Sequence, residues 1–214
     1  MGGPELTHIL RALPGIVMGF TVHEFMHAWA ADRLGDTTAR EEGRLTLNPV
    51  KHIDPWGLLL LLVAGFGWAR PVRFDPSKFR HPRRDEVLVS LAGPGANVLL
   101  GLLCALLVRM LTAAGPAAEG AAGETAAVLV TAVYVNAGLF VFNMLPIPPL
   151  DGSHLYLPFL KSGSRRLAAA LYRYGALAFI GVIIAEQVSG RDILPIGGAV
   201  RAVGGWMLAA AGLG

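Results

Sequence analysis

Residues 9–31 of the chain read ILRALPGIVMGFTVHEFMHAWAA, and this stretch decides the fold class. It is longer than the roughly 20 apolar residues with which a helix crosses the hydrocarbon core of a bilayer. Arg11, His23, Glu24 and His27 interrupt it. Ionisable groups inside a membrane helix are costly and usually mark a functional site. The stretch therefore predicts a membrane helix that carries chemistry.

The composition supports a membrane protein. Hydrophobic residues make up 54% of the chain and charged residues 15%, whereas an average soluble domain has about 25% charged residues. The basic residues lie in loops between apolar runs, which is typical of membrane orientation signals and not of a nucleic-acid interface. We therefore expect a lipid bilayer as partner and no nucleic acid. The single cysteine, Cys104, allows neither an internal disulfide nor a cysteine-type zinc site.

Five further apolar runs follow the first. They are Trp56–Trp68, Val87–Val108, Thr125–Leu145, Leu167–Ala185 and Ile193–Gly214. The first of these is too short for a comfortable crossing, and the last is glycine-rich and can either span the membrane or lie in its interface. The sequence thus predicts an all-α polytopic membrane protein of five to six segments. We expect one domain over residues 1–214, with a core over 9–160 and C-terminal helices over 165–214.

Charged loops predict the topology. Both flanks of Trp56–Trp68 contain several lysines and arginines, so the positive-inside tendency places both in the cytoplasm and favours a re-entrant element over a crossing. The N-terminus and the loop at residues 113–124 then lie outside. Two short alternating stretches, Arg44–Asn48 and Arg70–Phe74, are predicted to pair as a small membrane-associated β-hairpin beside the re-entrant element.

The polar residues of the first helix form the motif His23-Glu24-Phe25-Met26-His27. On a helix, two histidines four positions apart share one face, so both imidazoles can reach one metal ion. Glu24 then stands beside the metal and can take a proton from a metal-bound water. The alternative is a polar patch that neighbouring helices satisfy. The spacing favours a metal site.

A zinc site of the catalytic kind takes three protein ligands, so a third must come from elsewhere in the chain. The candidates are Asp151, His154, His52 and Asp54. Asp151 is the strongest, because the prolines before it break the preceding helix and free the backbone to fold back at membrane depth. Its alternative role is to cap a short helix that begins at Gly152.

Asn97 places an amide inside the run Val87–Val108, shortly after Gly93 and Pro94. It can donate a hydrogen bond to a developing oxyanion, or it can form an interhelical hydrogen bond. The sequence does not separate these two roles.

Together these stretches resemble the site-2 protease family of intramembrane zinc metalloproteases, in its compact form without PDZ or CBS domains. The matching stretches are 23–27, 43–55, 93–97 and 143–152, in the order of the family. The resemblance implies one Zn²⁺ per chain, with His23, His27 and Asp151 as ligands and Glu24 as catalytic base. It also implies that Asn97 and Asn143 assist near the scissile bond.

The resemblance implies a hydrolase that cuts transmembrane or membrane-proximal segments of membrane proteins. We expect it in a bacterial inner membrane, with the active site toward the cytoplasm, and the sequence leaves open whether it forms a homo-oligomer. Two alternatives are a di-metal membrane oxidase and a non-proteolytic zinc-binding membrane protein, either a transporter or chaperone-like.

Overall fold

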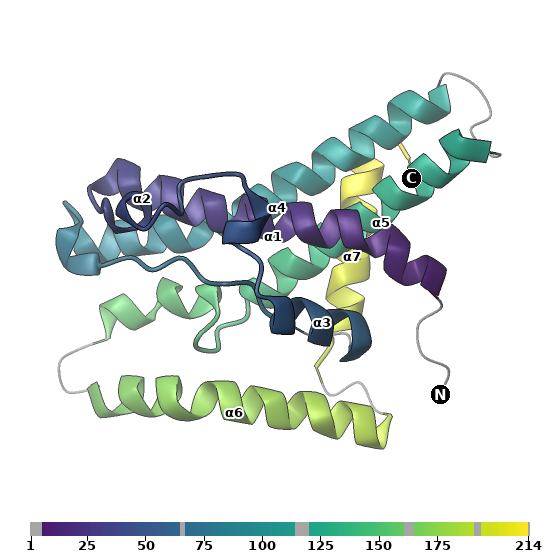
Figure 1. Cartoon of the computed structure of the whole chain (residues 1–214). Helices are drawn as coiled ribbons and strands as arrows, with labels where there is room; N and C mark the ends of the chain where they lie inside the picture. The colour runs from purple at the N-terminus through teal and green to yellow at the C-terminus, as the bar shows by residue number, and fades with distance from the viewer. Residues whose placement is uncertain (1–5, 65–66, 114–119, 161–164, 191–193, 214) are drawn as a thin grey trace.

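A computed structural model describes residues 6–64, 67–113, 120–160, 165–190 and 194–213. All regular elements in these ranges are helical (Figure 1). The α-helices are α1 (Leu6–Leu34), α2 (Thr38–Glu41), α3 (Pro55–Ala64), α4 (Pro82–Ala113), α5 (Gly120–Asn143), α6 (Arg165–Ser189) and α7 (Ile196–Ala210). Short 3₁₀ helices are η1 (Pro49–Lys51), η2 (Pro76–Lys78), η3 (Asp151–Leu155) and η4 (Leu157–Phe159).

Four of these helices are long and apolar enough to cross a membrane. They are α1, α4, α5 and the part of α6 at Ala169–Glu186. Helix α3 has 10 residues and α7 has 15, so both are shorter than the roughly 20 residues of a full crossing. The prediction of an all-α membrane protein is therefore confirmed, with four candidate spans among the described residues.

Helices α1, α4 and α5 pack against one another and form the centre of the molecule, and α7 packs across α4 and α5 (Figure 1). Small residues allow the close approach. A Cβ added at Gly15 of α1 would lie 2.8 Å from the Cα of Ala132 in α5. One at Gly101 of α4 would lie 2.6 Å from the sulfur of Met207 in α7. The first contact brings α1 close to α5, and the second brings α4 close to α7.

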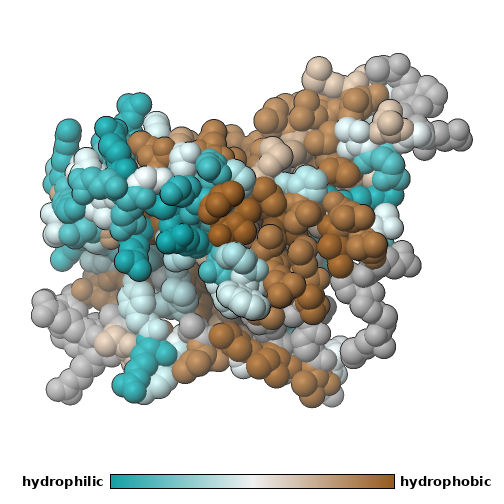
Figure 2. All heavy atoms as spheres, in the orientation of Figure 1, coloured by the Kyte–Doolittle hydropathy of each residue, from teal (hydrophilic) through white to brown (hydrophobic). Residues whose placement is uncertain are grey.

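Polar and apolar surfaces separate along the bundle. In Figure 2, hydrophilic residues gather around α2 and the loops beside it, and hydrophobic residues cover much of the rest of this face. The hydrophilic end is tied together by Asp36, which follows α1 and is fully buried. One carboxylate oxygen of Asp36 accepts from the main-chain N–H of Thr38 at 3.0 Å, and the other accepts from that of Asp75 at 2.6 Å.

The predicted β-hairpin is wrong. The described residues contain no strand, and the one isolated bridge joins Ile53 to Ala69. Residues 44–48 are bent, with the N–H of Thr46 bonded to the carbonyl of Arg44 at 2.9 Å. Residues 70–74, called the strap below, give main-chain hydrogen bonds to His52 and to a side chain of α1. The strap therefore finds its partners in loops and helix α1, and the alternation of its side chains is no evidence of a strand pair.

Candidate metal centre

Helix α1 brings the two histidines of the motif together, as the spacing predicts. The rings of His23 and His27 meet edge to face with centroids 4.6 Å apart, and their Nε2 atoms lie 3.0 Å apart. Both side chains are buried. Helix α4 presses against them at Gly93, where an added Cβ would lie 2.3 Å from Nε2 of His27. A larger residue at this point of α4 would force the histidine rings to move.

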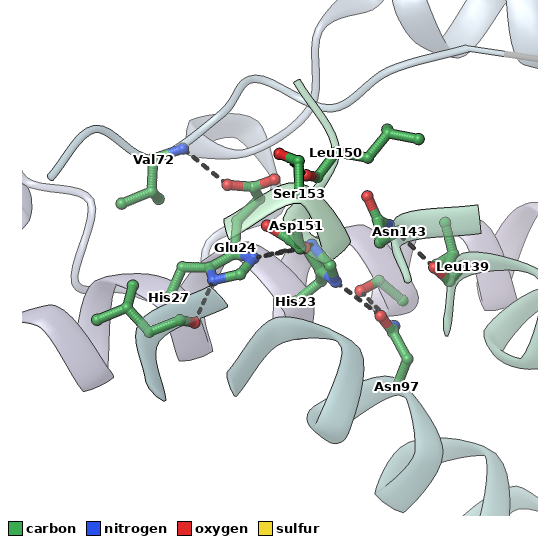
Figure 3. Close-up of polar contacts among 12 residues, drawn as sticks. His23, Glu24, His27, Val72, Asn97, Leu139, Asn143, Leu150, Asp151 and Ser153 are labelled. Carbon is green, nitrogen blue, oxygen red and sulfur yellow. Dashed lines mark hydrogen bonds and ion pairs between the residues drawn. The ribbon is translucent and has the colours of Figure 1, made fainter. Parts of the chain in front are cut away.

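The third group comes from the chain after α5. The segment following Asn143 turns back, and η3 begins at Asp151. The turn is tight at Gly152, because an added Cβ there would lie 2.4 Å from the carbonyl oxygen of Met144. This turn places Oδ2 of Asp151 at 3.2 Å from Nε2 of His23 and 3.3 Å from Nε2 of His27 (Figure 3). Among the described parts of the chain, these three residues are the one cluster with metal-ligand geometry.

The outer nitrogens of the two rings decide which atoms carry protons. Nδ1 of His27 lies 2.8 Å from the main-chain oxygen of Val89, and Nδ1 of His23 lies 2.7 Å from Oδ1 of Asn97. Both partners are acceptors, so each Nδ1 carries a proton, and in the neutral imidazole each Nε2 then presents a lone pair. Two lone pairs and a carboxylate oxygen therefore converge. Oδ2 of Asp151 is buried and, apart from these two Nε2 atoms, has no hydrogen-bond partner among the residues that the structure describes.

This arrangement fits a zinc ion. Three buried acceptors at 3.0, 3.2 and 3.3 Å from one another repel unless a cation lies between them. Zn–N and Zn–O bonds of about 2.0–2.2 Å in a tetrahedron set ligand atoms about 3.3–3.5 Å apart. The outer hydrogen bonds to Val89 and Asn97 are also the kind that orient metal-binding histidines. The donor set of two imidazoles and one carboxylate matches a catalytic zinc site.

Glu24 lies next to this cluster and is held from outside the helix. It is buried, and its carboxylate interacts electrostatically with His27. Oε2 of Glu24 accepts a hydrogen bond of 2.8 Å from the main-chain N–H of Val72, in the strap (Figure 3). The carboxylate is thus oriented by a main-chain donor that the sequence pattern does not reveal.

The strap is itself anchored at Arg70. Its N–H donates to the main-chain oxygen of His52 at 2.7 Å, and its carbonyl accepts from the guanidinium of Arg44. Arg44 is buried, and its positive charge attracts the carboxylate of Glu24. Arg44 therefore supports Glu24 both by its charge and by fixing the strap.

The other candidate third ligands have different partners. Nε2 of His52 lies 2.6 Å from the carbonyl of Thr46, and burial lowers the pKa of this histidine. Asp54 accepts from two main-chain N–H groups at the start of α3, at 3.0 and 2.9 Å. His154 lies 2.8 Å from a carboxylate oxygen of Glu86 in α4. The structure thus brings Asp151 to the histidine pair and places these three residues in supporting contacts.

The two asparagines expected to assist catalysis differ in their surroundings. Asn97 is fully buried in α4 and contacts His23, which is the interhelical hydrogen bond that the sequence left open. Asn143 is half-buried at the end of α5, and its amide donates to the carbonyl of Leu139 in the same helix at 2.9 Å. A role for Asn143 at the scissile bond stays a prediction.

Sequence reasoning missed Asn136. It lies in α5, is fully buried, and accepts a 3.0 Å hydrogen bond from the amide of Asn97. The available signal was an amide inside an apolar run, the same signal that singled out Asn97.

Comparisons with known proteins find relatives that are named as zinc metalloproteases. The sequence profile of Peptidase family M50 matches residues 107–185, a segment that contains Asp151. YwhC of Bacillus subtilis (strain 168), named as a zinc metalloprotease, is 40% identical over 171 residues, which cover 79% of this chain and 78% of YwhC. No solved structure matches the chain.

Two mycobacterial relatives extend the comparison. Rip2 of Mycolicibacterium smegmatis, also named as a zinc metalloprotease, is 33% identical over 84% of this chain and 69% of its own length. Rip2 of Mycobacterium tuberculosis (strain H37Rv) is 31% identical over 85% of this chain and 69% of its own. The chain therefore belongs to peptidase family M50, the site-2 protease family of intramembrane zinc metalloproteases.

Proposed function

We propose that this chain is a zinc metalloendopeptidase that hydrolyses peptide bonds in transmembrane or membrane-proximal segments of membrane proteins. One zinc ion per chain is held by His23, His27 and Asp151, and Glu24 is the catalytic base. The observation that carries the proposal is the convergence of two imidazole nitrogens and the buried carboxylate oxygen Oδ2 of Asp151 within 3.3 Å of one another.

The side chains divide the chemistry between them. Zinc, when bound, polarises a substrate carbonyl and lowers the pKa of a neighbouring water to about 7. Glu24 removes a proton from that water and delivers it to the leaving nitrogen. The N–H of Val72 holds Oε2 of Glu24 at 2.8 Å, so the carboxylate is positioned before substrate arrives. Asn97 and Val89 keep the histidines in the tautomer that presents Nε2.

The substrate must present an extended backbone at this site. The carbonyls of a membrane helix are bonded to N–H groups four residues later, so a helical substrate has to unwind locally before its scissile carbonyl is accessible. The strap crosses beside Glu24 and limits the space on that side. We therefore expect cleavage where the substrate helix is easily unwound, at helix ends or near Gly and Pro.

The orientation follows from the loops around the site. The strap carries Arg70 and Arg73, and the segment 32–55 carries three arginines and one lysine. Both lie at the ends of α1 and α4 that adjoin the site. The positive-inside tendency places these loops in the cytoplasm. We accordingly propose a bacterial inner membrane protein with its active site toward the cytoplasm. Support for the bacterial setting comes from the bacterial relatives.

The two alternatives are less well supported. A di-metal oxidase requires a second group of ligands, and the residues that the structure describes contain one such cluster. A non-proteolytic zinc protein does not require a general base beside the metal. Glu24, a buried carboxylate held next to the proposed ligands, therefore favours a hydrolase. Membership of the peptidase family also favours proteolysis.

Glu24→Gln tests the proposed function. The variant keeps the size of the side chain and the acceptor for Val72, so we expect wild-type zinc content and a loss of cleavage of at least about 100-fold, since proton transfer contributes about 10²–10⁴-fold. The assay uses the full chain in lipid vesicles with a reconstituted transmembrane substrate. Glu42→Gln, at an exposed position, is the matched control and keeps activity. Wild-type cleavage by Glu24→Gln rules out Glu24 as the base.

A further inference from the structure

We infer that Asn136 is a positioning residue that acts through Asn97 to hold His23 in its metal-binding tautomer. The inference rests on the proposed function of His23 as a zinc ligand. It assigns a role to a residue of α5, a helix that provides neither a proposed ligand nor the base. The argument follows a chain of hydrogen bonds from the backbone of α5 to the ring of His23.

The first link fixes the amide of Asn136. Its Nδ2 donates to the main-chain oxygen of Ala132, one turn earlier, at 2.9 Å. The oxygen Oδ1 of Asn136 therefore points away from its own helix. There it accepts from Nδ2 of Asn97 in α4 at 3.0 Å.

The second link fixes the amide of Asn97. Its Nδ2 donates to Asn136 and also to the main-chain oxygen of Gly19 in α1, at 3.2 Å. Both hydrogens of that amide are thus used, and Oδ1 of Asn97 faces Nδ1 of His23 at 2.7 Å (Figure 3). An oxygen at this place requires a proton on Nδ1, and in the neutral ring this leaves the lone pair on Nε2.

The two histidines differ in how firmly their surroundings fix the tautomer, with the proton on Nδ1. Nδ1 of His27 faces a main-chain carbonyl, that of Val89, which cannot exchange acceptor for donor. Nδ1 of His23 faces a side-chain amide, and an amide that rotates by half a turn presents its NH₂ group instead. His23 would then carry its proton on Nε2, and this N–H would point toward Asp151 and satisfy it without metal. The bond to Asn136 opposes that rotation, because the rotated Asn97 would turn its oxygen toward the oxygen of Asn136.

The helices packed around Asn136 leave space for its amide. It is fully buried. A Cβ added at Gly19 of α1 would lie 3.2 Å from Oδ1 of Asn136 and 2.6 Å from a methyl carbon of Leu139. A Cβ added at Gly101 of α4 would lie 3.6 Å from the Cβ of Asn136. The contact at Gly101 is an ordinary van der Waals distance, so Gly19 is the glycine that leaves room for the amide of the asparagine.

The test measures zinc affinity of the full chain in lipid nanodiscs, by competition with a chromophoric chelator. Asn136→Leu fills the site without offering an acceptor, and we expect zinc affinity to fall by about 10- to 100-fold, as for other groups that orient metal ligands. Asn136→Asp restores most of the affinity, because a buried, protonated carboxylic acid offers one acceptor and one donor, as the amide does. Thr131→Val is the matched control, since Thr131 lies on the same helix and its hydroxyl donates to the carbonyl of Ala127 in that helix.

A double-mutant cycle separates positioning from packing. If Asn136 acts through Asn97, Asn136→Leu causes no further loss of zinc affinity in an Asn97→Ala background. An equal loss in both backgrounds contradicts the inference, as does wild-type affinity of Asn136→Leu. Should the leucine variant not fold, Asn136→Ala takes its place in the cycle with the same expectations.

A His23→Ala variant distinguishes failure of this inference from failure of the proposed function. If His23→Ala retains zinc, the proposed metal site itself is wrong. If His23→Ala loses zinc and Asn136→Leu binds it normally, the metal site stands and the role of Asn136 is wrong.

Discussion

The main-chain N–H of Val72 donates a 2.8 Å hydrogen bond to Oε2 of Glu24, which lies 48 residues earlier in the chain. The bond connects the strap to the proposed base. The strap is in turn held by the main-chain oxygen of His52 and by the buried guanidinium of Arg44. The orientation of Glu24 thus depends on a loop that contributes no ligand.

Removing this donor tests the role of the strap. Val72→Pro has no N–H, and we expect it to keep zinc but to cleave substrate roughly 10- to 100-fold more slowly, since a hydrogen bond to a charged group contributes about 1.5–3 kcal/mol. Val72→Ala keeps the N–H and is the control. The measurement is kcat on a reconstituted substrate together with zinc content. Equal activity of the two variants contradicts a positioning role for the strap.

Gly93 tests the close contact of α4 with the two histidines. In Gly93→Ala the new methyl group would lie 2.3 Å from Nε2 of His27 and 2.8 Å from Cε1 of His23, so the rings have to move. We expect zinc affinity to fall by about 10-fold or more, in line with the usual cost of overpacking. Gly95→Ala on the same helix meets nothing within 4 Å and is the control. If both variants bind zinc as the wild type does, α4 does not confine the ligands as described.

The buried carboxylate of Asp36 leads us to expect that the stability of the hydrophilic end of the molecule depends on pH. Burial by itself raises the pKa of Asp36, but the hydrogen bonds from Thr38 and Asp75, with the charge of Lys78, outweigh it and hold the pKa below its usual value. A carboxyl whose pKa is lower in the folded state stabilises that state above the pKa of the unfolded chain, and this contribution is lost as the pH falls through the folded pKa. We therefore expect the region from α2 to η2 to loosen in acid.

Limited proteolysis across a pH series measures this effect. Cleavage within residues 36–79 of the wild type increases as the pH is lowered below the usual carboxyl range. Asp36→Asn is more readily cleaved than the wild type at neutral pH, and its cleavage depends less on pH. Glu42→Gln, an exposed control, follows the wild type. A wild-type protein whose cleavage does not change with pH contradicts the role of Asp36.

The sequence predicts the long helices and the metal-binding motif well, because both depend on local patterns. Apolar runs long enough to cross a membrane became α1, α4, α5 and α6, and the four-residue spacing of His23 and His27 placed their rings on one face. Helix α4 nevertheless begins at Pro82, earlier than its apolar run. Asp85 accepts from the N–H of His81 at 2.8 Å and so stabilises a polar first turn, which a search for apolar residues does not detect.

The errors and omissions concern partners that only the tertiary structure supplies. The alternation in residues 70–74 suggested a strand, yet the N–H groups of Val72 and Asp75 bond to carboxylates of Glu24 and Asp36. Asn136 carries the same signal as Asn97, an amide in an apolar helix, but that signal does not show which neighbouring helix the amide will face. Its partner is determined by the glycine contacts through which α1, α4 and α5 approach one another.

The proposed metal centre depends most directly on Asp151 as the third ligand. The measurement that tests it is the zinc affinity of Asp151→Ala, with Asp54→Ala as the control. We expect Asp151→Ala to weaken zinc binding by more than the roughly 100-fold that outer groups contribute, because it removes a ligand. Asp54→Ala, which alters the start of α3, keeps the zinc affinity of the wild type. Retention of wild-type zinc affinity by Asp151→Ala contradicts the proposed metal centre.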